Sequence, residues 1–109
     1  MTGETEAGER PPPELTSAVV VGTGLIGTSV ALALRDCGVR VGLVDQDPAT
    51  ARLAADIGAG AVLADALSTR AQEPVDLAVL AVPPAAVAPA LAAAQAVGLA
   101  RWYTVVASV

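Results

Sequence analysis

The stretch VVVGTGLIG (Val19–Gly27) leads from an apolar strand pattern into three glycines spaced G-x-G-x-x-G, and an apolar helical pattern follows. This spacing suits a turn that binds phosphate. Gly22 permits the tight strand-to-helix turn, Gly24 lets a pyrophosphate approach the backbone, and Gly27 lets the helix pack closely on the strand. The first N–H groups of a helix have no partners within it and lie at the positive end of its dipole, so they favour an anion. The stretch predicts a dinucleotide-binding site; the alternative is a glycine-rich structural turn.

An acidic residue at a suitable distance favours the dinucleotide interpretation. Asp45 stands twenty-one positions after Gly24, at the end of the next apolar run, Val39–Val44. An acid roughly 20 residues beyond the glycines binds the adenosine ribose in dinucleotide folds. The same carboxylate would repel a 2′-phosphate, so the predicted cofactor is NAD rather than NADP. The alternative role for Asp45 is that of a solvated loop acid.

Strand and helix patterns alternate along the rest of the chain. The expected strands are Ser17–Gly22, Val39–Val44, Ala61–Ala64, Asp76–Val82 and Tyr103–Ala107. The expected helices are Leu25–Cys37, Pro48 to about Ile57 with Asp47 as its N-cap, and about Ala85 to Val97, where Pro89 is tolerable only in the first turn. Residues 65–73 are a polar connection or a short helix. Parallel pairing through right-handed crossovers predicts a Rossmann-like, doubly wound α/β sheet with strand order 3-2-1-4-5, incomplete at the C-terminus.

Ligands of such sheets bind at the carboxyl ends of the strands, at the switch between strands 1 and 4. Four residues fall at or just beyond expected strand ends, namely Gly22, Asp45, Val82 and Ser108. The predicted cofactor-binding residues are Gly22, Thr23, Gly24, Leu25, Ile26, Gly27, Asp45, Val82 and Pro83. The alternative for Pro83 is a simple start of the following helix. Trp102 and Tyr103 are expected to pack rather than to stack on a base.

Composition limits the other classes of function. The chain has 109 residues, 54% of them apolar, and a net charge of −5, with no lysine and no histidine. Nucleic-acid binding and a metal site are therefore not expected. Cys37, the single cysteine, suits a reducing compartment and is expected to be a small packed hydrophobe, with a reactive thiol as the alternative. Glycines and prolines interrupt the long apolar runs, so no membrane segment is predicted and the protein is expected in the cytoplasm.

Two regions are expected along the chain. Residues 1–14 have four glutamates, one arginine and a run of three prolines, which predicts a disordered leader. Residues 15–109 are expected to form the nucleotide-binding domain. The pattern stops in or just after a strand, which predicts that this domain is a fragment.

Several segments together resemble the N-terminal part of the prephenate/arogenate dehydrogenase family. They are Val20–Ser29, Ala31–Leu34, Val44–Asp47, Asp76–Pro83 and Thr104–Val109. The last is similar to the family segment Thr-Asp-x-Gly-Ser-x-Lys. Two residues depart from this segment. Val105 stands where the family has Asp, and Ala107 stands where the family has Gly.

The resemblance implies oxidative decarboxylation of prephenate to 4-hydroxyphenylpyruvate, with hydride transfer to NAD, in tyrosine biosynthesis. It implies a catalytic role for Ser108, which supports a histidine that lies downstream in the family. The lysine, the substrate-binding arginine and the helical dimerisation domain also lie downstream. The resemblance therefore implies a small-molecule substrate, prephenate or arogenate, a homodimeric full-length enzyme, and a 109-residue chain that is inactive alone.

Two other interpretations remain open at the level of sequence. One is another NAD(P)-dependent dehydrogenase or reductase with the same half-fold. The other is a non-catalytic module that senses a nucleotide and regulates a partner, since such a module needs no catalytic histidine.

Overall fold

The computed structural model describes residues 14–106, so the predicted leader lies outside the described residues except for Glu14. Within them, one parallel sheet has the strand order β3-β2-β1-β4-β5, which confirms the predicted order. The strands are β1 (Ser17–Val21), β2 (Arg40–Val44), β3 (Ala61–Val62), β4 (Val75–Leu80) and β5 (Ala100–Val105). The helices are α1 (Leu25–Asp36), α2 (Pro48–Asp56) and α3 (Pro84–Ala96). This is the predicted Rossmann-like α/β arrangement.

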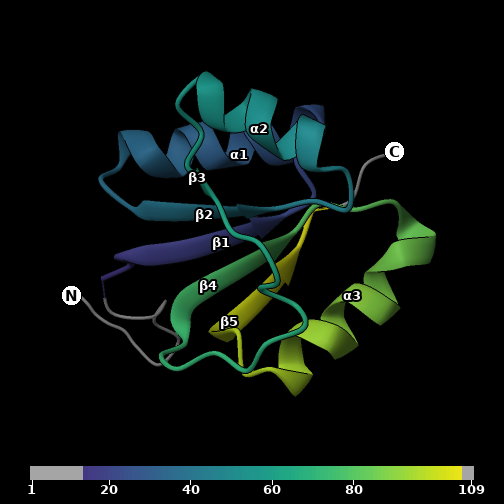
Figure 1. Cartoon of the computed structure of the whole chain (residues 1–109). Helices are drawn as coiled ribbons and strands as arrows, with labels where there is room; N and C mark the ends of the chain where they lie inside the picture. The colour runs from purple at the N-terminus through teal and green to yellow at the C-terminus, as the bar shows by residue number, and fades with distance from the viewer. Residues whose placement is uncertain (1–13, 107–109) are drawn as a thin grey trace.

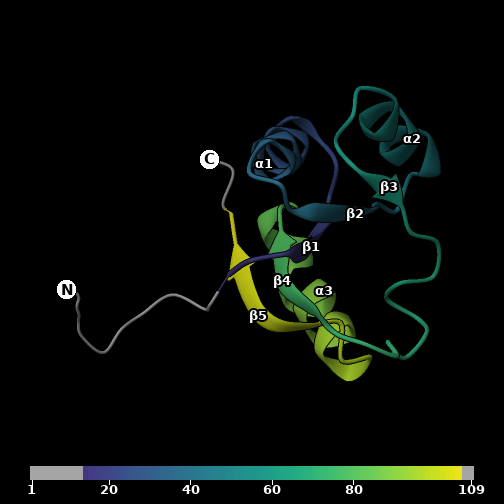
Figure 2. The same cartoon turned by 90° about the vertical axis from the view of Figure 1, so that its left-hand side faces the viewer.

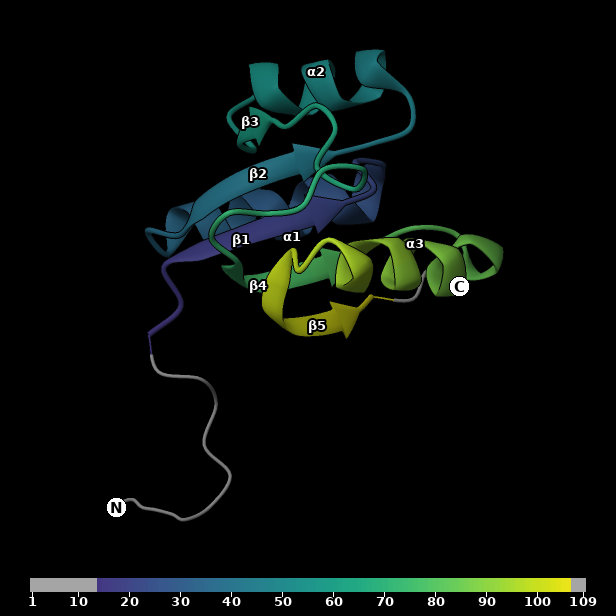
Figure 3. The same ribbon diagram turned by 60° about the horizontal axis from the view of Figure 1, so that its bottom comes forward.

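Helices cover both faces of the sheet. In Figure 1, α1 and α2 lie above the sheet and α3 lies below it, and Figure 2 shows the same three layers after a quarter turn. Figure 3 shows β1, β2 and β5 pointing the same way, so their carboxyl ends meet at one edge of the sheet. That edge is the place where a ligand of a doubly wound sheet binds.

Strand β1 forms the centre of both halves of the core. Its side chains alternate between the two faces. Ala18 and Val20 join the cluster beneath α1 and α2, while Val19 and Val21 join the cluster beside α3. All four are almost fully buried. A strand buried on both faces reads as a continuous apolar run, and for that reason the run before the glycines predicted β1 correctly.

Two of the expected helix boundaries rest on well-formed caps. The side chain of Asp47 accepts a hydrogen bond of 3.0 Å from the backbone N–H of Ala49, and Pro48 occupies the first helical position of α2. Gly38 follows α1 with a φ of 84°, a left-handed conformation that glycine adopts without strain. These contacts confirm Asp47 as an N-cap.

The position of Pro89 in the third helix differs from the expected one, which was the first turn. α3 begins at Pro84, so Pro89 is its sixth residue rather than part of its first turn. The missing N–H leaves the carbonyl of Ala85 without its usual partner. Both residues lie on the exposed side of the helix, where water can bond that carbonyl. Within the described residues, none of the helices is long and apolar enough to cross a membrane.

Three other expectations are corrected at the ends of elements. β3 covers two residues rather than four, although the N–H of Leu63 still donates to the carbonyl of Leu43 over 2.9 Å. β5 begins at Ala100, three residues before the expected start, because Ala100 already pairs with Val75. Cys37 is exposed rather than packed, since it stands beyond the last turn of α1 as its C-cap. Residues 65–73 form turns and bends without a helix.

Candidate nucleotide-binding site at the carboxyl edge of the sheet

The carboxyl ends of three neighbouring strands are joined by backbone hydrogen bonds. The N–H of Gly22, directly after β1, donates to the carbonyl of Val44 over 2.7 Å. The N–H of Ala81, directly after β4, donates to the carbonyl of Val21 over 2.8 Å. The glycine-rich loop (residues 22–27) therefore lies between the end of β2 and the end of β4.

The three glycines of this loop meet different surroundings. Gly22 has a φ of 99°, and a Cβ placed on it would overlap the carbonyl oxygen of Ala81. A Cβ on Gly27 would overlap the carbonyl oxygen of Gly22. By contrast, a Cβ on Gly24 would have no neighbour within 4 Å. Gly22 and Gly27 are thus required by the packing of the loop itself, whereas the space beside Gly24 is open to a ligand.

The beginning of α1 is free of side chains that compete with an anion. Gly24 is its N-cap and contributes no side-chain hydrogen bond, and the first turn contains no acidic residue. Leu25 is 87% exposed and Ile26 is 37% exposed, although both are large and apolar. A helix N-terminus with N–H groups that no side chain caps, beside open space, fits a pyrophosphate.

Asp45 lies against the glycine-rich loop. Its Oδ2 accepts a hydrogen bond of 2.7 Å from the backbone N–H of Thr23 and a second of 2.7 Å from the hydroxyl of Thr23. Its Oδ1 accepts one of 2.8 Å from the backbone N–H of Asp47. Burial raises the pKa of the Asp45 carboxyl, but these hydrogen bonds outweigh burial and hold the pKa below its ordinary value. Asp45 is therefore ionised at neutral pH.

Thr23 and Thr28 use their polar groups within the protein. Thr23 is 4% exposed. The hydroxyl of Thr28 donates to the carbonyl of Thr23 over 2.9 Å, so it connects the first turn of α1 to the loop. The hydroxyl of Ser29 donates to the carbonyl of Leu25 over 2.9 Å. The sequence pattern placed Asp45 near the glycine-rich loop but did not reveal its hydrogen bonds to Thr23, because that pattern assigns the acid to the ribose and gives no role to the side chain between the first two glycines.

The remaining predicted residues are placed as follows. Val82 is half-buried beside the loop, since its Cγ1 would lie 3.1 Å from a Cβ on Gly22. Pro83 is the N-cap position of α3, which agrees with its alternative role as the start of a helix. Ser108 lies outside the described residues. The structure thus brings the glycines, Asp45 and Val82 together at one edge of the sheet.

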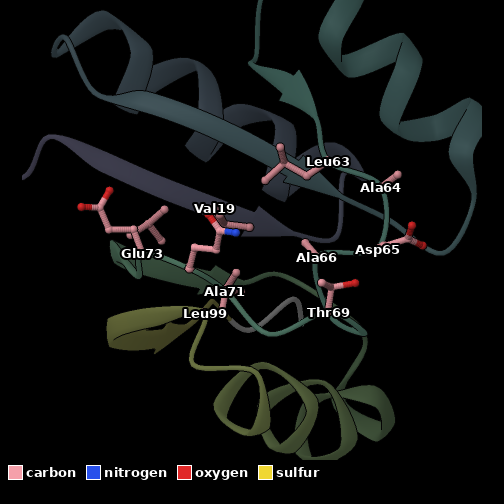
Figure 4. A pocket seen from close by; sticks show the side chains of 11 residues that line it. Val19, Leu63, Ala64, Asp65, Ala66, Thr69, Ala71, Glu73 and Leu99 are labelled. Carbon is pink, nitrogen blue, oxygen red and sulfur yellow. The ribbon is translucent and has the colours of Figure 1, made fainter.

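A pocket of about 290 Å³ lies elsewhere, on the face of the sheet that α3 covers. Figure 4 shows it between the β3–β4 connection and the sheet, with Val19 and Leu99 on the sheet side and Asp65 and Thr69 toward one end. None of the predicted cofactor-binding residues lines it. In residues 14–106 no three His, Cys, Asp or Glu side chains gather in a way that could hold a metal ion.

Comparison with known families agrees with this geometry. The model of the TrkA-N domain family matches residues 18–97. The chain belongs to that family. TrkA-N domains are NAD(H)-binding domains of the Rossmann type, so the predicted fold and the predicted cofactor, NAD, are both confirmed.

Similarity to one curated relative gives more specific information than the family match. This TrkA-N domain is 47% identical over 95 residues to a protein named "Probable prephenate dehydrogenase NovF" from Streptomyces niveus. The match covers 87% of the chain and 25% of the relative, so the chain spans about a quarter of that protein's length. The predicted resemblance to prephenate dehydrogenases is confirmed by this similarity.

Proposed function

We propose that this chain is the N-terminal, NAD-binding part of a prephenate dehydrogenase. The observation that carries the proposal is the position of an ionised carboxylate, Asp45, directly against the glycine-rich loop. Bound at this edge, NAD would supply a hydride acceptor. The similarity to the NovF protein supports prephenate as the substrate, with arogenate as the alternative.

Each part of the site has its own proposed role. The N–H groups at the start of α1, from Gly24 to Gly27, hold the pyrophosphate. Leu25 and Ile26 lie along the cofactor and shield it from water, which accounts for large apolar side chains at an exposed position. Asp45 accepts from the adenosine ribose, while Val82 and Pro83 bound the cofactor on the side of β4.

The chemistry on prephenate needs further residues. Ser108 is the one proposed catalytic residue in this chain, by resemblance alone. We place the full-length enzyme in the cytoplasm as a homodimer that acts on a small molecule in tyrosine biosynthesis and has no nucleic-acid partner. Support comes from the net charge of −5, from the single cysteine and from the resemblance.

The role of Asp45 is tested by Asp45→Ala, with the affinities for NAD and NADP measured by isothermal titration calorimetry. A hydrogen bond to a charged group contributes about 1.5–3 kcal/mol, so we expect NAD to bind roughly 10- to 100-fold more weakly. The affinity for NADP should fall much less, because removal of the carboxylate also removes its repulsion of the 2′-phosphate.

Asp56→Ala serves as the control for this experiment. It removes one negative charge from the exposed last residue of α2 and should leave both affinities unchanged. Equal losses for NAD and NADP in Asp45→Ala would mean that Asp45 does not touch the ribose.

A further inference from the structure

The Asp45 carboxylate has few acceptor positions left for a ligand. An ionised carboxyl offers about four lone-pair positions, two on each oxygen. Oδ2 already accepts from both the N–H and the hydroxyl of Thr23, and Oδ1 accepts from the N–H of Asp47. The remaining position is therefore on Oδ1.

The hydroxyl of Thr23 is not available to a ligand in the same way. Thr23 is a buried polar residue directly before three exposed residues of the loop, and its hydroxyl donates to Asp45 over 2.7 Å. Its carbonyl is held in turn by the hydroxyl of Thr28. Carboxylate, glycine-rich loop and first turn of α1 are therefore connected by side-chain hydrogen bonds into one unit.

We propose that Thr23 is a positioning residue that sets the choice of cofactor through Asp45. Its hydroxyl holds Oδ2 against the glycine-rich loop, so that Oδ1 is the atom that accepts from the adenosine ribose of NAD. This inference rests on the proposed function, because it assumes that Asp45 binds the ribose. It adds that the ribose-binding carboxylate and the pyrophosphate-binding loop are held in a fixed relation before the cofactor binds.

The test compares two substitutions at position 23. Thr23→Val keeps the shape of the side chain and the backbone N–H but removes the hydroxyl, whereas Thr23→Ser keeps the hydroxyl. We expect Thr23→Val to bind NAD about 3- to 10-fold more weakly, because Asp45 keeps its contact with the ribose but is held less firmly, and Thr23→Ser to restore most of the affinity.

Thr50→Val is the matched control. The hydroxyl of Thr50 donates to Oδ2 of Asp47 over 3.1 Å, which is the same kind of bond on the neighbouring aspartate. Its removal should leave the NAD affinity unchanged, since the Asp47 side chain caps α2, whereas its contact with Asp45 is made through the backbone N–H, which the substitution keeps.

The pH dependence of NAD binding separates positioning from a merely structural role. NAD affinity should fall as the pH drops through the pKa of Asp45, because a protonated carboxyl no longer attracts the ribose hydroxyl as strongly. The hydroxyl of Thr23 favours the charged form, so in Thr23→Val this fall should begin at a higher pH.

Few charged groups other than Asp45 lie in the segments around the glycine-rich loop that could change the pH at which NAD affinity falls. The glycine-rich loop and the first two turns of α1, residues 22–32, contain no ionisable side chain, and neither do residues 77–85 after the start of β4. The segment after β2 contains the acid Asp47, the segment after β3 contains Asp65, and α2 contains Arg52 and Asp56. The ion pair recorded among residues 14–106 joins Arg101 to Asp76 and does not involve Asp45.

The outcomes distinguish this inference from the proposed function. If the wild-type chain binds no NAD, the proposed function is overturned. If it binds NAD and Thr23→Val has the wild-type affinity and pH profile, or Thr23→Ser is as weak as Thr23→Val, the positioning role is overturned and the function stands.

An NMR titration of the Asp45 carboxyl without cofactor tests, independently of NAD binding, whether the Thr23 hydroxyl holds the carboxylate in place. A pKa that rises in Thr23→Val supports the inference, and an unchanged pKa contradicts it. Circular dichroism first establishes that Thr23→Val is folded. If it is not, the wild-type titration decides, since an Asp45 pKa at or above that of a free aspartate overturns the inference.

Discussion

Single residues in the glycine-rich loop have separable roles. Gly27 is buried and has the carbonyl of Gly22 where its Cβ would be. Gly24 is exposed, with a φ of −72° that any residue adopts and with open space beside it. The fold therefore requires glycine at position 27, whereas at position 24 we propose that glycine leaves room for the ligand.

Alanine substitutions should separate these two roles. Gly27→Ala introduces an overlap with backbone, and we expect a loss of stability of about 1–3 kcal/mol, seen as a lower urea midpoint. Gly24→Ala should keep a midpoint close to that of the wild type but weaken NAD binding by about tenfold or more, equivalent to 1.4 kcal/mol. A Gly24→Ala variant with wild-type NAD affinity would contradict the proposed pyrophosphate position.

At the scale of elements, β1 and β4 are joined at their amino ends as well as along their lengths. Oδ2 of Asp76, in β4, accepts from the N–H and the hydroxyl of Thr16, each over 2.9 Å, and from the N–H of Ser17 over 3.3 Å. The hydroxyl of Ser17 accepts in return from the N–H of Asp76 over 3.1 Å. Arg101 of β5 lies 4.0 Å from Oδ1 of Asp76. One carboxylate thus connects three strands.

The hydrogen bonds and the ion pair of Asp76 should make the stability of the fold depend on pH. The bonds from Thr16 hold the pKa of Asp76 below its ordinary 3.8, and these bonds, the N–H of Ser17 and Arg101 together outweigh the effect of burial. A lowered folded-state pKa gives a contribution that is present above pH 3.8 and is lost as the pH falls through the folded-state pKa. We expect Asp76→Asn to be less stable than the wild type at pH 7, with the difference shrinking toward pH 2.5.

Urea unfolding between pH 7 and pH 2.5 measures this difference. Thr16→Val removes one donor and should give a smaller change of the same kind. A constant gap between Asp76→Asn and the wild type across that range would mean that the carboxylate charge contributes nothing.

Much of the fold follows from local patterns, and the departures have local physical causes. The β1 run, the glycine spacing and the Asp47-Pro48 start predicted elements correctly because each depends on neighbouring residues. Pro89 was misjudged because its tolerance depends on which side of α3 faces water. The predicted strand order already placed β1 beside β2, but the bond between Thr23 and Asp45 depends on the direction of one side chain, which a residue pattern does not contain.

At the scale of the whole molecule, the proposed cofactor site lies in a chain whose sequence has no histidine. The family resemblance assigns a histidine to the substrate hydroxyl, and the 109 residues contain none. We therefore expect the chain to bind NAD and to form no NADH from prephenate, as followed by absorbance at 340 nm. Sustained NADH formation by the purified chain would contradict this part of the proposal.

The sheet also has a single junction between its halves. The unit β3-β2-β1 meets the unit β4-β5 along β1 and β4, and the chain crosses between them through a connection that has no helix. The glycine-rich loop follows β1, the strand of the first unit at this junction, and Val82 and Pro83 follow β4, the strand of the second unit. A dinucleotide lying across this edge would contact both strands, and we expect bound NAD to slow the hydrogen exchange of the backbone amides of β1 and β4.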